Sequence, residues 1–308
     1  MDPHYISIPN EIIVQDSEFT FSIYIHLDSH YAAFIPKGIP VDEKKLALAK
    51  NKKIFILESD IYAYQESYKK FLETLDSTDR TLHIKREAFS TITKIFESND
   101  TASALQAAVP VMENLVNFIT SVPGAISNLL QLSSHSYYTY NHSVNVAVYT
   151  LSLCMKAVKT LTKDEMRSIA LGGFLHDIGK SKVPLHIINK PDKLTEEEWS
   201  IMKKHPEWGY EMVKNEKFCD AIVGSIILQH HENFNGTGYP GGLEKEQIHP
   251  FAQICAVADS YDAMTNKRVY AKQMTGKQAL DALQRSRGSR YNPKFLNLFS
   301  TKGDYTTE

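Results

Sequence analysis

Five histidines and two aspartates, spread over about half of this 308-residue chain, carry the side chains that bind divalent transition metals. Most of them lie within or beside apolar helical patterns, where an unsatisfied polar group costs roughly 2–7 kcal/mol. One shared metal centre would satisfy all of them together. We therefore predict a buried metal centre made by His142, His176, Asp177, His205, His230, His231 and Asp259.

The elements that must position these side chains are helices. From about Ala107 to Phe299 the chain shows successive helical patterns separated by loops rich in Gly, Pro and Asn. From Asp60 to about Gln131, apolar residues also recur three and four positions apart. We predict a mainly α fold, a helical bundle in which inward-facing side chains of neighbouring helices hold the metals.

The first 58 residues differ from the rest of the chain. Residues 19–27 and 31–35 are rich in β-forming types, a short helix is expected over 42–51, and 52–59 resembles a third strand. We predict a small N-terminal α+β module with a candidate regulatory role. It contributes no metal ligand, and we expect its histidines to be structural or surface groups: His4, His26 and His30.

The predicted domain organisation has three parts. Residues 1–58 form the α+β module, 59–109 are connecting helices, and 110–308 form the metal-binding domain. Pro110 and the Pro123-Gly124 pair interrupt the helical pattern that runs from Asp60 to about Gln131.

The overall composition is that of an ordinary soluble globular protein, with 43% hydrophobic residues, 23% charged residues and a formal net charge of -2. The charge disfavours a role in coating DNA, because such proteins usually carry a basic excess. We expect no signal peptide, and no apolar run approaches the ~20 residues of a membrane helix. The three cysteines lie in apolar stretches and predict reduced thiols in a cytoplasmic protein: Cys154, Cys219 and Cys255.

The sequence around the predicted ligands resembles the HD superfamily of metal phosphohydrolases. The His176-Asp177 pair lies in GFLHDIGK, and the segment HHENFNGTGYPGGL is similar to that of the HD-GYP family within this superfamily. That segment contains Gly238, Tyr239 and Pro240, which the family places in a loop beside the active site that contacts substrate or partner proteins. The resemblance covers about residues 110–300.

The resemblance implies two metal ions that share one aspartate. It assigns His142, His176, Asp177 and Asp259 to one ion, and it assigns the other to Asp177, His205, His230 and His231. Iron or manganese is favoured because the site offers imidazole and carboxylate without cysteine, and zinc remains possible. Two ions ~3.5–4 Å apart suit an activated hydroxide and in-line phosphoryl displacement. Tyr138, four residues before His142, is a poor ligand, so we expect two ions rather than three.

The function that this resemblance implies is hydrolysis of a cyclic dinucleotide, with cyclic di-GMP giving pGpG or GMP as the leading expectation. One alternative is a signalling module with low turnover that binds a cyclic dinucleotide or a protein partner. Another alternative keeps the catalysis and changes the cyclic dinucleotide, because the sequence shows no residue that reads the base.

Four further residues have expected roles near the metals. The resemblance makes Lys180 a catalytic contact to the substrate phosphate, whereas Arg268 either reaches a phosphate or pairs with an acid. Glu232 and Asp262 lie near ligands in the sequence, so we expect them to orient imidazole rings. The chain departs from the usual family pattern at four positions: Phe234, Asn235, Val269 and Asn292.

Overall fold

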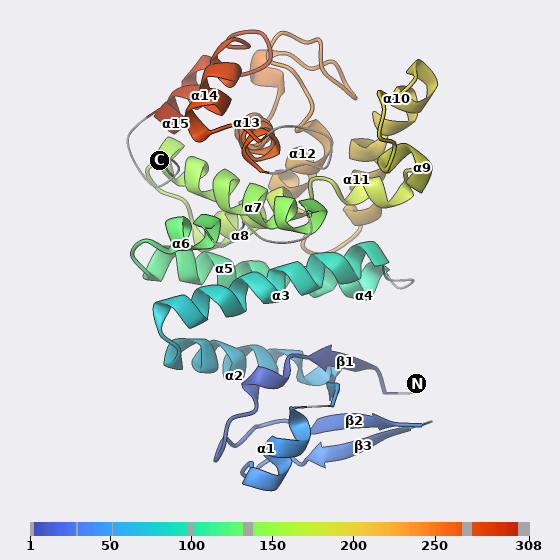
Figure 1. Cartoon of the computed structure of the whole chain (residues 1–308), viewed down its shortest axis with the longest axis vertical. Coiled ribbons are helices and arrows are strands. Elements are labelled where there is room, and N and C mark those ends of the chain that lie inside the picture. Colours follow the sequence, from blue (N-terminus) through green and yellow to red (C-terminus); the bar gives the residue numbers. More distant parts are fainter. Residues whose placement is uncertain are drawn as a thin grey trace. The chain divides into compact units, whose positions relative to one another are not determined.

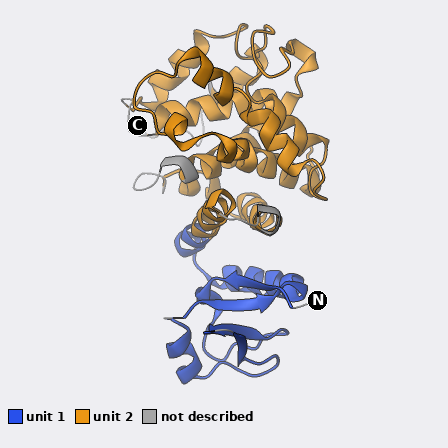
Figure 2. Cartoon of the chain, turned by 90° about the vertical axis from the view of Figure 1, so that its right-hand side faces the viewer, with its two compact units in different colours: residues 1–83 blue, residues 84–308 orange. Residues whose placement is uncertain are grey.

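The computed structural model describes residues 3–28, 30–50, 52–97, 101–131, 138–266 and 273–300, with only the backbone of 101–103, 138–140 and 300. The chain divides into two compact units, residues 1–83 and 84–308 (Figure 2). The sequence predicted three parts, with boundaries at residues 58 and 109, and that division stays a prediction.

The N-terminal unit contains a four-stranded antiparallel sheet with the strand order β1-β4-β2-β3. Figure 1 labels three of these strands, β1, β2 and β3. Three strands and the helix α1 (Glu43–Ala49) fall where the sequence predicted them. The prediction missed β1, which is only four residues long and pairs with the distant β4. The strands are β1 (Tyr5–Ile8), β2 (Ile23–Leu27), β3 (His30–Ile35) and β4 (Ile54–Leu57).

The second unit is helical, as the sequence predicted, so the chain is mainly α with a small N-terminal α+β part. None of the described helices is long and apolar enough to cross a membrane. The short 3-10 helices are η1 (Asn10–Ile12), η2 (Glu58–Asp60), η3 (Ile178–Lys182) and η4 (Lys245–Gln247). The remaining helices are α2 (Ile61–Thr74), α3 (Ser77–Glu97), α4 (Thr101–Gln106), α5 (Ala108–Ser121), α6 (Ala125–Gln131), α7 (Tyr138–Ala157), α8 (Lys163–Leu175), α9 (Leu185–Ile188), α10 (Glu196–Met202), α11 (His205–Val213), α12 (Ala221–Gln229), α13 (Pro250–Thr265), α14 (Gly276–Gln284) and α15 (Pro293–Ser300).

The core of the helical unit is formed by α7, α8, α12 and α13, which lie side by side (Figure 1). Two glycines let α8 approach its neighbours closely. A Cβ atom on Gly172 would lie 2.8 Å from Ile226 of α12, and one on Gly173 would lie 3.0 Å from the Ala147 backbone of α7. These helices are therefore closely packed, and six of the seven predicted ligands lie within them or directly after them.

Side-chain caps fix where two of these helices begin. Thr162 and Glu165 form a capping box at the start of α8. At the start of α12, the Asp220 carboxylate accepts hydrogen bonds from the backbone N–H groups of Ile222 and Val223, both at 2.9 Å. The Ser168 hydroxyl of α8 donates to the same carboxylate at 2.6 Å, which ties the two helices together.

Candidate metal centre

The seven predicted ligands lie in three helices of the second unit or directly after two others. His176 and Asp177 follow α8, and His205 is the first residue of α11. His230 and His231 follow α12, whereas His142 and Asp259 lie within α7 and α13. His231 is half-buried, and the fully buried imidazoles include His176, His205 and His230, each exposed by 1% or less.

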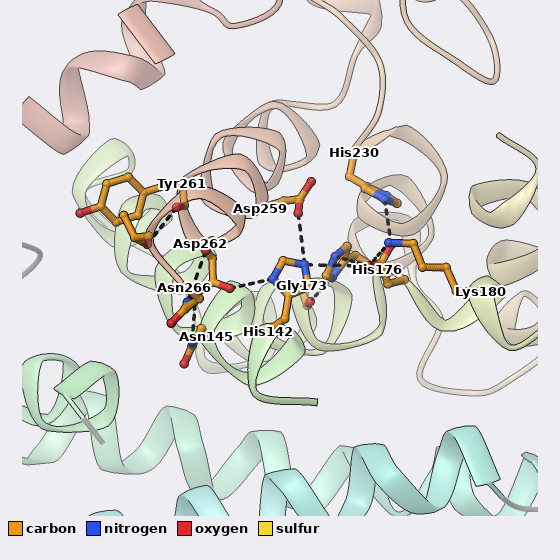
Figure 3. Close-up of polar contacts among 12 residues, drawn as sticks. His142, Asn145, Gly173, His176, Lys180, His230, Asp259, Tyr261, Asp262 and Asn266 are labelled. Carbon is orange, nitrogen blue, oxygen red and sulfur yellow. Dashed lines mark hydrogen bonds and ion pairs between the residues drawn. The ribbon is translucent and has the colours of Figure 1, made fainter. Parts of the chain in front are cut away.

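Asp177 lies at the centre of this group. Figure 3 labels four of the other candidate ligands, which are His142, His176, His230 and Asp259. Its Oδ2 atom lies 3.3 Å from Nε2 of His176 and 3.9 Å from Nε2 of His142. Its Oδ1 atom lies 3.2 Å from Nε2 of His205 and 3.8 Å from Nε2 of His230. Asp177 thus faces four imidazole rings and stands between two groups of candidate ligands.

The candidate ligand atoms form two groups that share Asp177. In one group, atoms of Asp177, His205, His230 and His231 lie within 4.8 Å of one another; the other group contains His142, His176 and Asp177. Asp259 adjoins the second group, because its Oδ1 lies 3.2 Å from Nε2 of His142. The division is the one that the sequence resemblance implied.

Three histidines are oriented by backbone carbonyl groups three residues earlier in the chain. In each ring Nδ1 faces a backbone carbonyl oxygen, which only accepts, so Nδ1 carries the proton and Nε2 keeps a lone pair. The pairs are His176 with Gly173 at 2.8 Å, His205 with Met202 at 2.8 Å, and His230 with Ile227 at 2.9 Å.

The fourth ring, His142, is oriented by a carboxylate. Its Nδ1 lies 2.7 Å from Oδ2 of Asp262, which is fully buried. Asn145 donates to the other oxygen of Asp262 at 2.9 Å, and Asn266 donates to that oxygen as well. The prediction that Asp262 orients an imidazole is confirmed. The two asparagines were missed, although Asn145 follows His142 by three and Asn266 follows Asp262 by four, which places each pair on one helix face.

The resulting arrangement of lone pairs fits divalent cations. Nε2 of His205 and Nε2 of His230 lie 3.3 Å apart, although neither carries a proton in these tautomers. Nε2 of His176 and Oδ1 of Asp177 are buried without a hydrogen-bond partner in the part of the chain that the structure describes. Lone pairs that converge in this way repel one another, and each buried unsatisfied atom is unfavourable. Metal ions bound to these atoms would remove both problems.

The electrostatic environment gives most of these groups the protonation state that metal binding needs. Burial lowers the pKa of His230 to about 4 and that of His231 well below its usual range. Burial raises the pKa of Asp177, but Lys180 and His176 outweigh it and hold this pKa well below the ordinary value. At neutral pH these rings are neutral and this carboxylate is ionised.

His142 is the exception. Burial lowers its pKa, yet the hydrogen bonds and charges of Asp259 and Asp262 outweigh burial and raise the pKa to about 9. A metal ion that binds Nε2 of His142 must therefore displace a proton.

Lys180 lies beside the bridging candidate Asp177. Its ammonium Nζ is 2.5 Å from Oδ2 of Asp177, and the side chain is 31% exposed. The ammonium is thus next to the centre and still reaches solvent. Arg268 and Val269 lie outside the described residues, as does the side chain of Tyr138.

Glu232 has a different role from the one predicted. Its two carboxylate oxygens accept from the backbone N–H groups of Gly241 at 2.6 Å and Leu243 at 3.0 Å. The prediction that it orients an imidazole is wrong, because the chain turns back after His231 and presents loop amides to this carboxylate. Glu232 instead fixes the loop 233–243. Gly238 is required in this loop, since a Cβ atom there would lie 2.2 Å from the backbone nitrogen of Asn233.

The loop places an aromatic ring against the metal centre. Tyr239 lies over His231, with ring centroids 4.8 Å apart and an angle of 30° between the planes. Trp199 of α10 meets Tyr239 edge to face at 6.1 Å and is 46% exposed. Pro240, which follows, is half-buried. Sequence reasoning missed Trp199, because a single exposed tryptophan has no pattern that ties it to the site.

Two of the departures from the family pattern keep local hydrogen bonds. The Asn235 side-chain oxygen accepts from the Thr237 hydroxyl at 2.7 Å. The Asn292 side-chain oxygen accepts from the Lys294 backbone at 2.9 Å, at the start of α15. Both side-chain oxygens act as acceptors, as those of an aspartate would, and the Asn292 amide also donates to the Gln253 side-chain oxygen at 2.9 Å.

A helical fold with a buried cluster of histidines and aspartates defines the class of this domain as a helical domain with a candidate metal centre. The HD domain family model matches residues 117–295, which is more than half of the chain. The chain therefore belongs to the HD domain family, and the resemblance drawn from the sequence is confirmed.

Curated proteins provide two similar sequences. The chain is 38% identical over 177 residues to cyclic di-GMP phosphodiesterase PA4108 of Pseudomonas aeruginosa, covering 58% of this chain and 42% of that protein. It is 33% identical over 168 residues to 3'3'-cGAMP-specific phosphodiesterase 2 of Vibrio cholerae, covering 54% of this chain and 32% of that protein. The chain thus spans less than half the length of either relative.

One solved structure shares the fold over nearly the whole chain. It is Bd1817, described as an HDG"Y"P protein from Bdellovibrio bacteriovorus, with a TM-score of 0.64 and 23% sequence identity. The match covers 96% of this chain and 98% of that chain.

Proposed function

We propose that this protein is a metal-dependent phosphodiesterase that hydrolyses a cyclic dinucleotide, with cyclic di-GMP giving pGpG or GMP as the leading substrate. The observation that carries the proposal is the convergence of unprotonated Nε2 atoms on one buried carboxylate, that of Asp177. Relatives named as phosphodiesterases of cyclic di-GMP and of 3'3'-cGAMP support the substrate class.

Two divalent transition-metal ions fit this site. His142, His176, Asp177 and Asp259 would hold one ion, and Asp177, His205, His230 and His231 would hold the other. Iron or manganese suits a set of imidazole and carboxylate ligands that lacks cysteine, and zinc is the third candidate. When bound, a pair of such ions activates water and neutralises the charge of a phosphodiester.

The chain's own groups prepare the site for this reaction. Backbone carbonyls hold three imidazole rings in one tautomer and one orientation, so the ligand atoms do not have to rearrange when substrate binds. The Lys180 ammonium, 2.5 Å from Asp177, is placed to meet a phosphate oxygen as negative charge develops. Lysine suits this task because its ammonium is a compact point charge.

The aromatic pair beside the centre supports a substrate that carries bases. Tyr239 covers His231, and Trp199 presents a partly exposed ring next to Tyr239. Stacking of a base on such rings tolerates different bases, so this pair favours a nucleotide substrate without choosing guanine over adenine. The loop of Gly238, Tyr239 and Pro240 is also the surface that we propose for a signalling partner.

A reducing compartment suits the three cysteines. Cys154 and Cys255 are buried and free, and Cys219 is free and half-buried. Free thiols of this kind support our proposal of a cytoplasmic protein.

The test is a chromatographic hydrolysis assay on protein purified without oxygen, with metal content measured on the same sample. Cyclic di-GMP, 3'3'-cGAMP and cyclic di-AMP are supplied in parallel to the wild type and to Asp177→Ala. We expect the wild type to release pGpG or GMP and the variant to be inactive. Metal-loaded wild type that binds these compounds and hydrolyses none of them would refute the enzyme and favour the signalling module.

A further inference from the structure

The sheet of the N-terminal unit has two chemically different faces. The register pairs Tyr24 with Phe55 and His26 with Tyr31, and residues opposite each other in antiparallel strands point to the same side. Side chains alternate along a strand, so Ile23, Ile54 and Ile56, which neighbour Tyr24 or Phe55, point to the other side. Ile35 joins them, because a bulge in the register pairs it with Ile23. These four isoleucines are fully buried, at 0% exposure. The face that lacks them is aromatic.

The rings on the aromatic face touch one another. Tyr5 and Tyr31 stack with centroids 3.9 Å apart and 14° between their planes. Phe55 meets Tyr31 edge to face at 5.0 Å, and His26 does so at 4.7 Å. The open side of an antiparallel sheet usually carries polar residues, and this one carries a cluster of rings. Tyr5, Tyr24 and Tyr31 are half-buried and Phe55 is buried, whereas His26 is exposed.

One end of this face is a hollow with a basic rim. Its volume is about 450 Å³, which falls in the range of small-molecule sites. Its lining consists of Ile25, His26, Tyr31, Lys52, Lys53 and Phe55. Both lysines are exposed, and neither ammonium forms an ion pair with a carboxylate among the residues that the structure describes. The rings of Tyr31 and Phe55 form the aromatic floor of the hollow. The Lys53 ammonium lies 5.6 Å from the centroid of the Phe55 ring.

We propose that this hollow binds a nucleoside monophosphate. The base would pack against Tyr31 and Phe55, because aromatic side chains stack on any base. The phosphate would lie on Lys52 and Lys53, whose charges have no carboxylate partner there. A long nucleic acid is the poorer occupant, because the chain carries a net charge of -2 and the hollow has the volume of a small molecule. The proposal does not depend on the activity of the metal centre.

The experiment is a calorimetric titration of the full chain with GMP and with AMP, compared with guanosine and with inorganic phosphate. We expect a mononucleotide to bind at least tenfold more tightly than guanosine or phosphate alone, because it uses the rings and the lysines together. Lys53→Glu should weaken binding at least tenfold. Lys37→Glu should leave it unchanged, since Lys37 is an exposed lysine that follows the opposite end of β3.

A second variant tests the aromatic floor. Tyr31→Leu keeps an apolar side chain at the position and removes the ring, so it should weaken nucleotide binding about tenfold. Thermal melting shows whether Tyr31→Leu folds. If it does not fold, Lys53→Glu alone tests the proposed binding, because Lys53 is exposed and its substitution should not disturb folding.

GMP is also a product of the proposed reaction, so the metal centre must be excluded as its binding site. His205→Ala removes a candidate metal ligand and should bind GMP with unchanged affinity. Loss of binding in His205→Ala together with normal binding in Lys53→Glu would overturn the proposal. Absence of binding of both mononucleotides at millimolar concentration would overturn it as well.

Discussion

Replacing Lys180 with methionine removes one charge next to the metal centre and leaves the rest of the side chain largely in place. The Lys180 ammonium lies 2.5 Å from Oδ2 of Asp177, which is the carboxylate shared by both candidate metal sites. A phosphate that reacts at this centre would come within reach of the same ammonium. Loss of one preorganised charge-stabilising group costs about 2.7–4 kcal/mol in the activation barrier. We therefore expect Lys180→Met to lower turnover about 10²–10³-fold.

The same substitution should have little effect on folding. The Lys180 side chain is 31% exposed, and pairs with partial exposure contribute little after solvent screening. We expect the free energy of unfolding of the metal-loaded protein to change by no more than ~1 kcal/mol. A large loss of activity without a comparable loss of stability separates a catalytic contact from a structural one.

The assay is steady-state hydrolysis of cyclic di-GMP with metal content determined on the same samples. Lys182→Met is the matched control, because Lys182 lies in the same short helix, is exposed and faces no catalytic group in our assignment. It should keep wild-type turnover. Wild-type turnover in Lys180→Met at full metal content would refute the catalytic contact.

Four further substitutions test the centre and the residues packed around it. Asp177→Ala should lose both metal ions and His231→Ala only one, and elemental analysis that finds full metal content in Asp177→Ala would contradict the bridging role. Asp262→Asn should lower metal affinity about 10–100-fold, because His142 loses the carboxylate that holds its Nδ1. The measurement is a chelator competition, and unchanged affinity would reject this role of Asp262. Gly179→Ala should destabilise the protein by about 2–3 kcal/mol in denaturant unfolding, since its Cβ would clash with backbone atoms of the neighbouring helix α11; wild-type stability would show that this close approach is unnecessary.

The sequence alone predicted which residues could bind metal. It could do so because a residue's type, and its position beside an apolar helical run, can both be read from the local sequence. His176 and Asp177 are adjacent, and an imidazole or carboxylate in an apolar helix has few other ways to be satisfied. The mainly α fold followed from the same periodicity. The strand β1 was missed because four residues give too little pattern, and its pairing with β4 bridges about fifty residues of chain.

The orientation of the ligands depended on contacts that no local pattern contains. Asp262 and His142 are 120 residues apart, and only the packing of α13 against α7 brings them within 2.7 Å. Glu232 lies next to a ligand in the sequence, yet the turn after His231 directs its carboxylate to loop amides nine and eleven residues away. Proximity to a ligand in the sequence led to the same prediction for both carboxylates, that each orients an imidazole ring. The prediction was right for Asp262 and wrong for Glu232.

The sequence by itself determined which side chains are available for metal chemistry and that helices carry them. The tertiary structure alone decided that the Nε2 atoms converge on Asp177 while the Nδ1 protons face carbonyl or carboxylate oxygens. It also decided that the rings of Tyr5, Tyr31 and Phe55 share one face of a sheet. The physical reason is the same in both cases. A residue type is encoded locally, whereas the direction of its functional atom is fixed by packing between segments that are distant in the chain.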